Sequence, residues 1–133
     1  CDVHPLRYAD ALLIFAEAES QANSGPTTDA YEAVNQIRRR AYGVDLNTPN
    51  AAVDVPAGLN AAQFRDAVIQ ERAYEFCIEG KRWWDLKRTG TTKAVIEALG
   101  KTFPEKYLYF PIPVTEIDNN ELIDQADQNP GWE

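Results

Sequence analysis

The chain has 133 residues, enough for one domain with its own hydrophobic core, and its 44% apolar and 26% charged residues are ordinary for a soluble globular protein. A net charge of −8 excludes the basic face that nucleic acid requires and also a polybasic membrane patch, but it suits neutral ligands or cationic partners. No run of about 18 apolar residues offers a membrane span. Because a helical pattern begins already at Leu6, we expect the sequence to be part of a longer protein.

The first predicted helix runs from about Leu6 to Asn23, where Ser24-Gly25-Pro26 ends it. Apolar side chains surround most of this helix, and at about 100° per residue Asp10, Glu17 and Gln21 share one narrow polar sector. A helix that is apolar on most sides packs against several neighbours. We therefore expect it to lie centrally, with its alanines allowing close approach.

The second predicted helix runs from about Asp29 to Tyr42, capped by Thr27, Thr28 or Asp29 and ended by Gly43. Its apolar residues form one stripe: Ala30, Ala33, Val34, Ile37 and Ala41. Two helices joined by a short turn form an antiparallel hairpin of the kind found in helical repeats. The tetratricopeptide consensus itself is absent, so the likeness is architectural.

Residues 44–59 form a predicted loop, and Asn60 then caps a third helix that extends to about Glu79, with Gly80 ending or bending it. Shorter helices are predicted over about 81–87, 91–99 and 114–119. From residue 100 onward prolines and aromatics predict an extended, packed tail. The sequence thus predicts one all-α domain over residues 1–133, built from antiparallel tetratricopeptide-like hairpins with a long irregular C-terminal tail.

The third helix carries a charged sector in which Glu71, Arg72, Glu75 and Glu79 fall within roughly 100° of one another. One hypothesis is that Glu71 and Glu75 form the carboxylate pair of a glycoside hydrolase. The other is an ion-pair network that fastens this helix to the first two, through partners on those helices: Glu17, Arg38, Arg39 and Arg40. We favour the network, because each acid has an arginine within one turn, which lowers a carboxylate pKa and so works against a general acid.

Other kinds of catalytic or metal site have weaker support in the sequence. His4 is the only histidine, and no glycine-rich phosphate loop occurs. Asp118-Asn119-Asn120-Glu121 is a weak calcium candidate that we interpret as a solvated turn. Cys77 is expected to be a small buried hydrophobic residue, and its pairing with Cys1 has little support. We predict no catalytic residues, no metal site and no cofactor.

Several aromatic side chains can either stack on sugar rings or pack the tail onto the helices. They are Trp83, Trp84, Tyr107, Tyr109, Phe110 and Trp132. Packing is the favoured interpretation, because at least one of the two adjacent tryptophans must face the core. The segment from Tyr107 to Pro113 is expected to fasten the tail.

Five blocks of the chain resemble, in order, motifs of the SusD/RagB family. They are Arg7–Ala18 (RYADALLIFAEA), Val34–Ala41 (VNQIRRRA), Glu71–Phe76 with Glu79–Arg88 (ERAYEF, EGKRWWDLKR), Tyr109–Pro113 (YFPIP) and Gln128–Trp132 (QNPGW). Each block alone is weak, but five in order over nearly the whole chain are specific. Because these motifs look like scaffold motifs, no ligand-binding residue is carried over from the family.

The resemblance implies a helical, lipid-anchored protein on the surface of the Gram-negative outer membrane. Such a protein captures glycans or other nutrients and works with a SusC-like, TonB-dependent transporter. It also implies that the lipid-bearing cysteine lies in a preceding part of a longer protein, and that Cys1 is not that residue, since Leu6 already opens a core helix. Two alternatives remain: a helical module that only docks a partner protein, and a glycoside hydrolase fragment.

Overall fold

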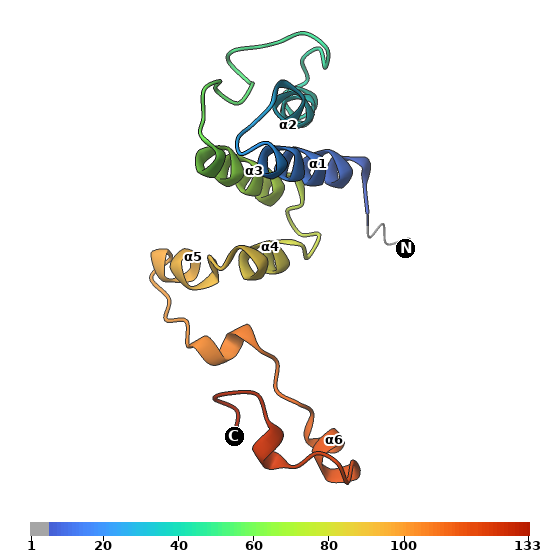
Figure 1. Ribbon diagram of the computed structural model, residues 1–133, viewed down its shortest axis with the longest axis vertical. Coiled ribbons are helices and arrows are strands. Elements are labelled where there is room, and N and C mark those ends of the chain that lie inside the picture. Colours follow the sequence, from blue (N-terminus) through green and yellow to red (C-terminus); the bar gives the residue numbers. More distant parts are fainter. Residues whose placement is uncertain (1–5) are drawn as a thin grey trace. The chain divides into compact units, whose positions relative to one another are not determined.

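The structure is a computed structural model that describes residues 6–133, so the expectations for Cys1 and His4 lie outside the described residues. The chain divides into two compact units, with the boundary between Arg82 and Trp83. Every regular element within residues 6–133 is a helix, which confirms the all-α class (Figure 1). None of the helices in that range is both long and apolar enough to cross a membrane.

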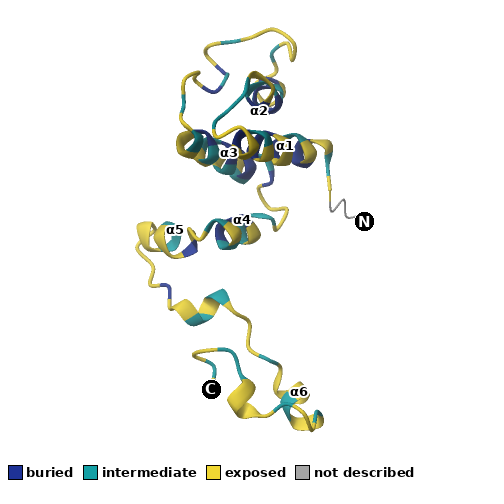
Figure 2. Cartoon of the chain, in the orientation of Figure 1, coloured by how far each residue is buried: buried dark blue, intermediate teal, exposed yellow. Residues whose placement is uncertain are grey.

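The first unit contains three main helices, α1 (Tyr8–Ala22), α2 (Thr28–Ala41) and α3 (Ala61–Glu75). α1 packs against both α2 and α3, as expected for a helix that is apolar on most sides (Figure 1). The buried core joins all three helices and consists mainly of Ala9, Leu13, Ala16, Ala30, Val34, Ile37, Phe64 and Val68. In Figure 2 the buried residues concentrate on the facing sides of these helices. The predicted hairpin of the first two helices is thereby confirmed.

Local capping sets the starts of α2 and α3. Thr27 Oγ1 accepts a hydrogen bond from the backbone N–H of Ala30 (3.2 Å). Asn60 and Gln63 form a reciprocal capping box, in which each side chain accepts from the backbone N–H of the other (2.9 and 3.0 Å). Both caps were among the predicted ones. Such caps can be predicted from the sequence because their hydrogen bonds span only three residues.

The end of α3 differs from the prediction. The helix stops at Glu75 instead of about Glu79, and Ile78 adopts a left-handed conformation (φ 69°) in the turn that follows. Cys77 is therefore an exposed, free cysteine, and the prediction that it is buried was wrong. The helical wheel that predicted its burial no longer applies beyond residue 76.

The second unit contains α4 (Arg82–Thr89, which begins at the boundary), α5 (Thr92–Ala98), α6 (Val114–Asn119) and two short 3-10 turns, Glu105–Leu108 and Gln125–Asp127. Phe103 is buried in this unit, with its ring centroid 6.3 Å from that of Trp83 and 6.1 Å from that of Tyr107. The three short helices start within a residue of their predicted positions.

Side-chain hydrogen bonds to the backbone link the last residues of the chain to residues 106–112. The Gln128 amide accepts from Ile112 N (2.7 Å) and donates to Ile112 O (3.0 Å). Asn129 Nδ2 donates to Phe110 O (2.7 Å), and Trp132 Nε1 donates to Lys106 O (3.0 Å). We call this arrangement of residues 106–112 and 128–132 the tail clamp. It explains why the YFPIP and QNPGW blocks occur together: one supplies backbone groups and the other the side chains that bind them.

Candidate functional site

The carboxylates at the end of α3 are bound by arginines from the other two helices. Glu71 Oε2 accepts from Arg38 Nη1 on α2 (2.8 Å). Glu75 accepts from Arg7, which precedes α1 (2.8 Å), and from Arg40 on α2. The predicted network is thus confirmed for Arg38 and Arg40, which tie α2 to α3.

A second group of ion pairs centres on Asp10, which is buried on α1. Its carboxylate accepts from Arg72 Nη1 (2.8 Å) and from Lys81 Nζ. Burial alone would raise the pKa of Asp10, but the hydrogen bonds from Lys81 and Arg72 outweigh it, so the pKa lies below its ordinary value. Asp10 therefore holds the end of α3 and the turn after it against α1.

The ring of Phe76 lies under three of these cations. The guanidinium carbons of Arg7 and Arg72 are each 5.0 Å from the ring centroid, and Lys81 Nζ is 4.4 Å from it. Cations within about 6 Å of a ring face are attracted by its quadrupole. Arg7 also binds Glu79 (2.7 Å), whose pKa that hydrogen bond lowers. These contacts fix the position and direction in which the chain leaves α3.

Arg39, which was expected to fasten α2 to α3, instead binds its own helix and the loop between α2 and α3. Its buried guanidinium donates to Asp54 Oδ1 and Oδ2 (2.8 and 2.6 Å), to Glu32 (2.9 Å) and to Leu46 O (2.8 Å). The pKa of Asp54 is lowered, chiefly by the hydrogen bond from Arg39. Asn35 Oδ1 accepts from Val55 N (2.8 Å) and secures the far end of the loop. The loop is thus held in place by side chains of α2.

The geometry gives no support to a general acid at Glu71 or Glu75. Both carboxylates accept hydrogen bonds from arginine, whereas a general acid must hold a proton at the reaction pH. The expected partner Glu17 lies 3.7 Å from Arg65 Nε, so it too contributes to joining α1 and α3. The sequence did not reveal Arg7, Asp10 and Lys81 as members of the network. The polar sector of the first helix was the available signal for Asp10.

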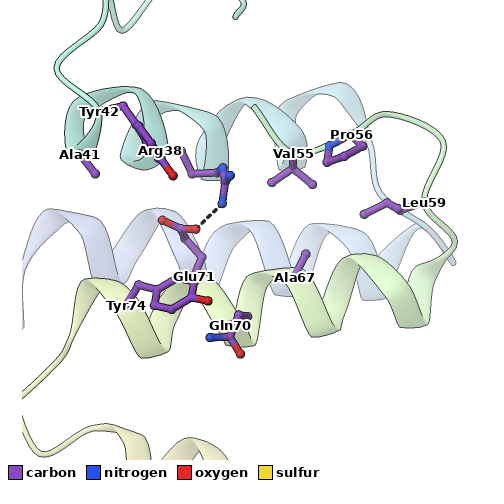
Figure 3. Close-up of a pocket in the computed structure, with 10 residues that line it drawn as sticks. All are labelled: Arg38, Ala41, Tyr42, Val55, Pro56, Leu59, Ala67, Gln70, Glu71 and Tyr74. Atoms are coloured by element: carbon purple, nitrogen blue, oxygen red, sulfur yellow. Dashed lines mark hydrogen bonds and ion pairs between the residues drawn. The ribbon is translucent and has the colours of Figure 1, made fainter. Parts of the chain in front are cut away.

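A groove of about 610 Å³ opens between the C-terminal half of α2, the loop after it and α3 (Figure 3). It is lined by Arg38, Ala41, Tyr42, Val55, Pro56, Leu59, Ala67, Gln70, Glu71 and Tyr74. In Figure 3 the Arg38–Glu71 ion pair bridges the two helices, with Tyr42 on the α2 side and Tyr74 on the α3 side. Neither tyrosine was predicted as a site residue. The signal was their spacing, because Tyr42 follows Arg38 by one turn and Tyr74 follows Glu71 by one turn.

The aromatic candidates of the second unit fall into two groups. Trp83 and Trp132 pack on rings in that unit, and the centroids of Tyr107 and Trp132 are 5.8 Å apart. Trp84, Tyr109 and Phe110 are exposed, and so is Tyr107 despite its ring contacts. Ring packing within the unit is thus observed for Trp83, Tyr107 and Trp132, whereas packing of the tail onto the helices stays a prediction.

The two asparagines of the calcium candidate make local hydrogen bonds one helical turn back along the chain. Asn119 Nδ2 donates to Thr115 O (2.6 Å), and Asn120 Nδ2 donates to Glu116 (2.8 Å). Within residues 6–133 no group of three or more His, Cys, Asp or Glu side chains could hold a metal ion. The segment is a helix end and turn, in line with the favoured interpretation.

Comparisons with known proteins agree with these observations. The sequence model described as the SusD family matches residues 1–132. SusD-like protein P2 of Formosa agariphila is 33% identical over an alignment that covers 96% of this chain and 25% of that protein. SusD-like protein P38 of the same organism is 34% identical over 90% of this chain and 23% of that protein. The chain thus spans about a quarter of the length of these curated relatives.

Solved structures show the same relationship. A SusD homolog from Bacteroides thetaiotaomicron matches with a TM-score of 0.80 and 38% identity, over 96% of this chain and 26% of that one. A SusD superfamily protein from Bacteroides vulgatus matches with a TM-score of 0.76 and 30% identity, over 98% of this chain and 27% of that one. Fold and sequence therefore lead to one conclusion: the chain belongs to the SusD family.

Proposed function

We propose that this chain is the C-terminal scaffold of a receptor that binds glycans or related nutrients at the surface of the outer membrane. The family match over residues 1–132 is the observation that carries the proposal. The protein acts without catalysis, which accords with the binding of Glu71 and Glu75 by arginines. No cofactor is required.

In this proposal the receptor is held to the membrane by a lipid anchor in the part of the protein that precedes the chain. It delivers its ligand to a SusC-like, TonB-dependent transporter. The net charge of −8 suits this role, because it keeps an exposed protein soluble and does not favour contact with anionic membrane surfaces. The chain contributes a helical scaffold held by buried ion pairs.

The proposal is tested by calorimetric titration of the protein that carries this chain against a panel of oligosaccharides. Binding of at least one glycan, without its turnover, is the expected result. Isolation of the same protein from outer membranes together with a TonB-dependent transporter would support the partnership. A protein that binds no member of a broad panel contradicts the receptor proposal.

A docking module without ligand is the second candidate, and one observation favours it. Tyr8, Ile14 and Phe15 leave large apolar side chains exposed on α1, as a surface that meets another protein would. Substitution of Phe15 by serine would then abolish partner binding and leave glycan titrations unchanged. The glycoside hydrolase alternative predicts that the protein hydrolyses a glycan and that Glu71→Gln abolishes this hydrolysis.

A further inference from the structure

The ion pair in the groove retains hydrogen-bonding capacity after its internal contacts are made. Arg38 donates through Nε to Val53 O (2.6 Å) and through Nη1 to Glu71 Oε2 (2.8 Å). Among the residues that the structure describes, nothing accepts from Arg38 Nη2 and nothing donates to Glu71 Oε1. A donor and an acceptor are therefore held in place by one ion pair. Adjacent hydroxyl groups, which both donate and accept, are complementary to such a pair.

Two tyrosines flank this ion pair. Tyr42 is 67% exposed and Tyr74 is 66% exposed, and each lies one helical turn beyond a member of the pair (Figure 3). Val55, Leu59 and Ala67 add an apolar part to the lining. A ligand that combines flat apolar faces with a rim of hydroxyls meets both kinds of surface. The volume of about 610 Å³ lies within the range of roughly 300–1,000 Å³ usual for small-molecule sites.

Charge narrows the class of ligand further. Arg38 and Glu71 cancel each other, so the groove offers no net positive charge from its lining residues. The chain as a whole carries 13 basic and 21 acidic side chains. A carboxylated or sulfated ligand would meet the repulsion of this acidic surface without a free cation to bind it. The groove therefore favours an uncharged polyhydroxylated ligand.

We propose that this groove is a subsite for a neutral saccharide unit. Tyr42 and Tyr74 contact the apolar faces of the sugar ring, while Arg38 Nη2 donates to one hydroxyl and Glu71 Oε1 accepts from another. The inference rests on the proposed glycan-binding function. It goes further by naming the residues of a site in this chain and by selecting neutral over acidic glycans.

The test is calorimetric titration of the protein that carries this chain with two sets of oligosaccharides, one neutral and one bearing uronate or sulfate groups. Tyr42→Ala and Tyr74→Ala are compared with Tyr8→Ala, a control at a tyrosine of α1 that is 76% exposed and outside the groove. Each groove variant is expected to weaken binding of the neutral ligand by roughly tenfold, with the control unchanged. Thermal unfolding of all three variants is expected to match the parent protein, because the side chains are exposed.

Four results would overturn the inference, and the first three separate it from the proposed function. Neutral saccharide binding that both groove variants retain within about twofold would remove the subsite and leave the receptor intact. Binding of acidic saccharides alone would contradict the ligand class. Groove variants that lower the melting temperature without weakening saccharide binding would show that the groove packs against polypeptide. Absence of any saccharide binding by the parent protein would overturn both proposals.

Discussion

The ion pair between Arg72 and Asp10 is enclosed, with the two side chains only 8% and 6% exposed. Removing the arginine leaves a buried carboxylate with one partner fewer, and breaking a buried pair in this way costs about 3–5 kcal/mol. We expect Arg72→Ala to lower the free energy of unfolding by about 3 kcal/mol, measured by urea denaturation.

The control for this variant is Lys93→Ala. Lys93 lies 3.5 Å from Glu105, and both side chains are exposed. An exposed ion pair contributes only about 0–1 kcal/mol, so this change should be nearly neutral. Arg72→Ala with an unchanged unfolding curve would contradict the structural role of the network.

Asp54 makes stability depend on pH, because folding lowers its pKa from the ordinary value of 3.8 through the hydrogen bond from Arg39. The unfolded chain therefore binds the proton more readily, and stability from Asp54 is full above about pH 5 and lost as pH falls through the lowered folded pKa. We expect Asp54→Asn to be less stable than the parent at neutral pH. The difference in melting temperature should narrow below about pH 4, measured by calorimetry across the acid range. A difference that stays constant to the lowest pH would be evidence against this assignment.

At the scale of the element, Gly131 shows how the tail clamp depends on one residue without a side chain. Its φ is +83°, and a Cβ built on it would lie 2.7 Å from Lys106 Cβ. Gly131→Ala is expected to destabilise the clamp by more than about 1 kcal/mol, through backbone strain and this contact. Hydrogen exchange of the backbone amides in residues 106–112 is expected to accelerate.

Gly25→Ala is the matched control, since no atom lies within 4 Å of a Cβ placed there and its φ is not positive. This substitution should leave exchange in residues 106–112 unchanged. Equal exchange in the Gly131→Ala variant and the parent would remove the clamp as an explanation of the QNPGW motif.

The elements that local chemistry determines could be predicted from the sequence. Thr27 and Asn60 start α2 and α3 through hydrogen bonds to residues three positions later, so the starts were predicted to within a residue or two. The end of α3 could not be predicted in this way. Phe76 leaves the helix where its ring lies under Arg7 and Lys81, and Arg7 is far away in the sequence. Gly80, the local signal, indicated a later end.

The site was only partly predictable for the same reason. The charged sector of α3 follows from helical periodicity, and its pairing with Arg38 and Arg40 was expected. The pairing of Arg72 with Asp10 joins residues 62 positions apart, so it required the packing of α1 on α3. The groove was not predictable, because its lining combines α2, α3 and the loop that Arg39 holds in place. Loop placement depends on these tertiary contacts.

At the scale of the whole molecule, most of the positive charge of the first unit is used internally. Arg7, Arg38, Arg39, Arg40 and Arg72 all bind carboxylates of the same unit. The net charge of −8 is therefore presented to solvent mainly as acidic side chains. This distribution repels anionic ligands and leaves uncharged ligands unaffected. Under the proposed subsite, electrostatics on this scale would therefore favour neutral over acidic saccharides and have no part in how a neutral one is held.

The salt dependence of saccharide binding tests whether charge contributes to holding a neutral ligand. Raising the ionic strength from about 0.01 M to 1 M shortens the screening length from about 30 Å to about 3 Å. The dissociation constant of a neutral oligosaccharide should then change by less than about twofold, because no net charge is transferred to the site. Weak binding of an acidic oligosaccharide should strengthen as salt screens the repulsion. Affinity for a neutral ligand that falls steeply with salt would mean that the ligand meets an unscreened charge, and would contradict a site built on the balanced Arg38–Glu71 pair.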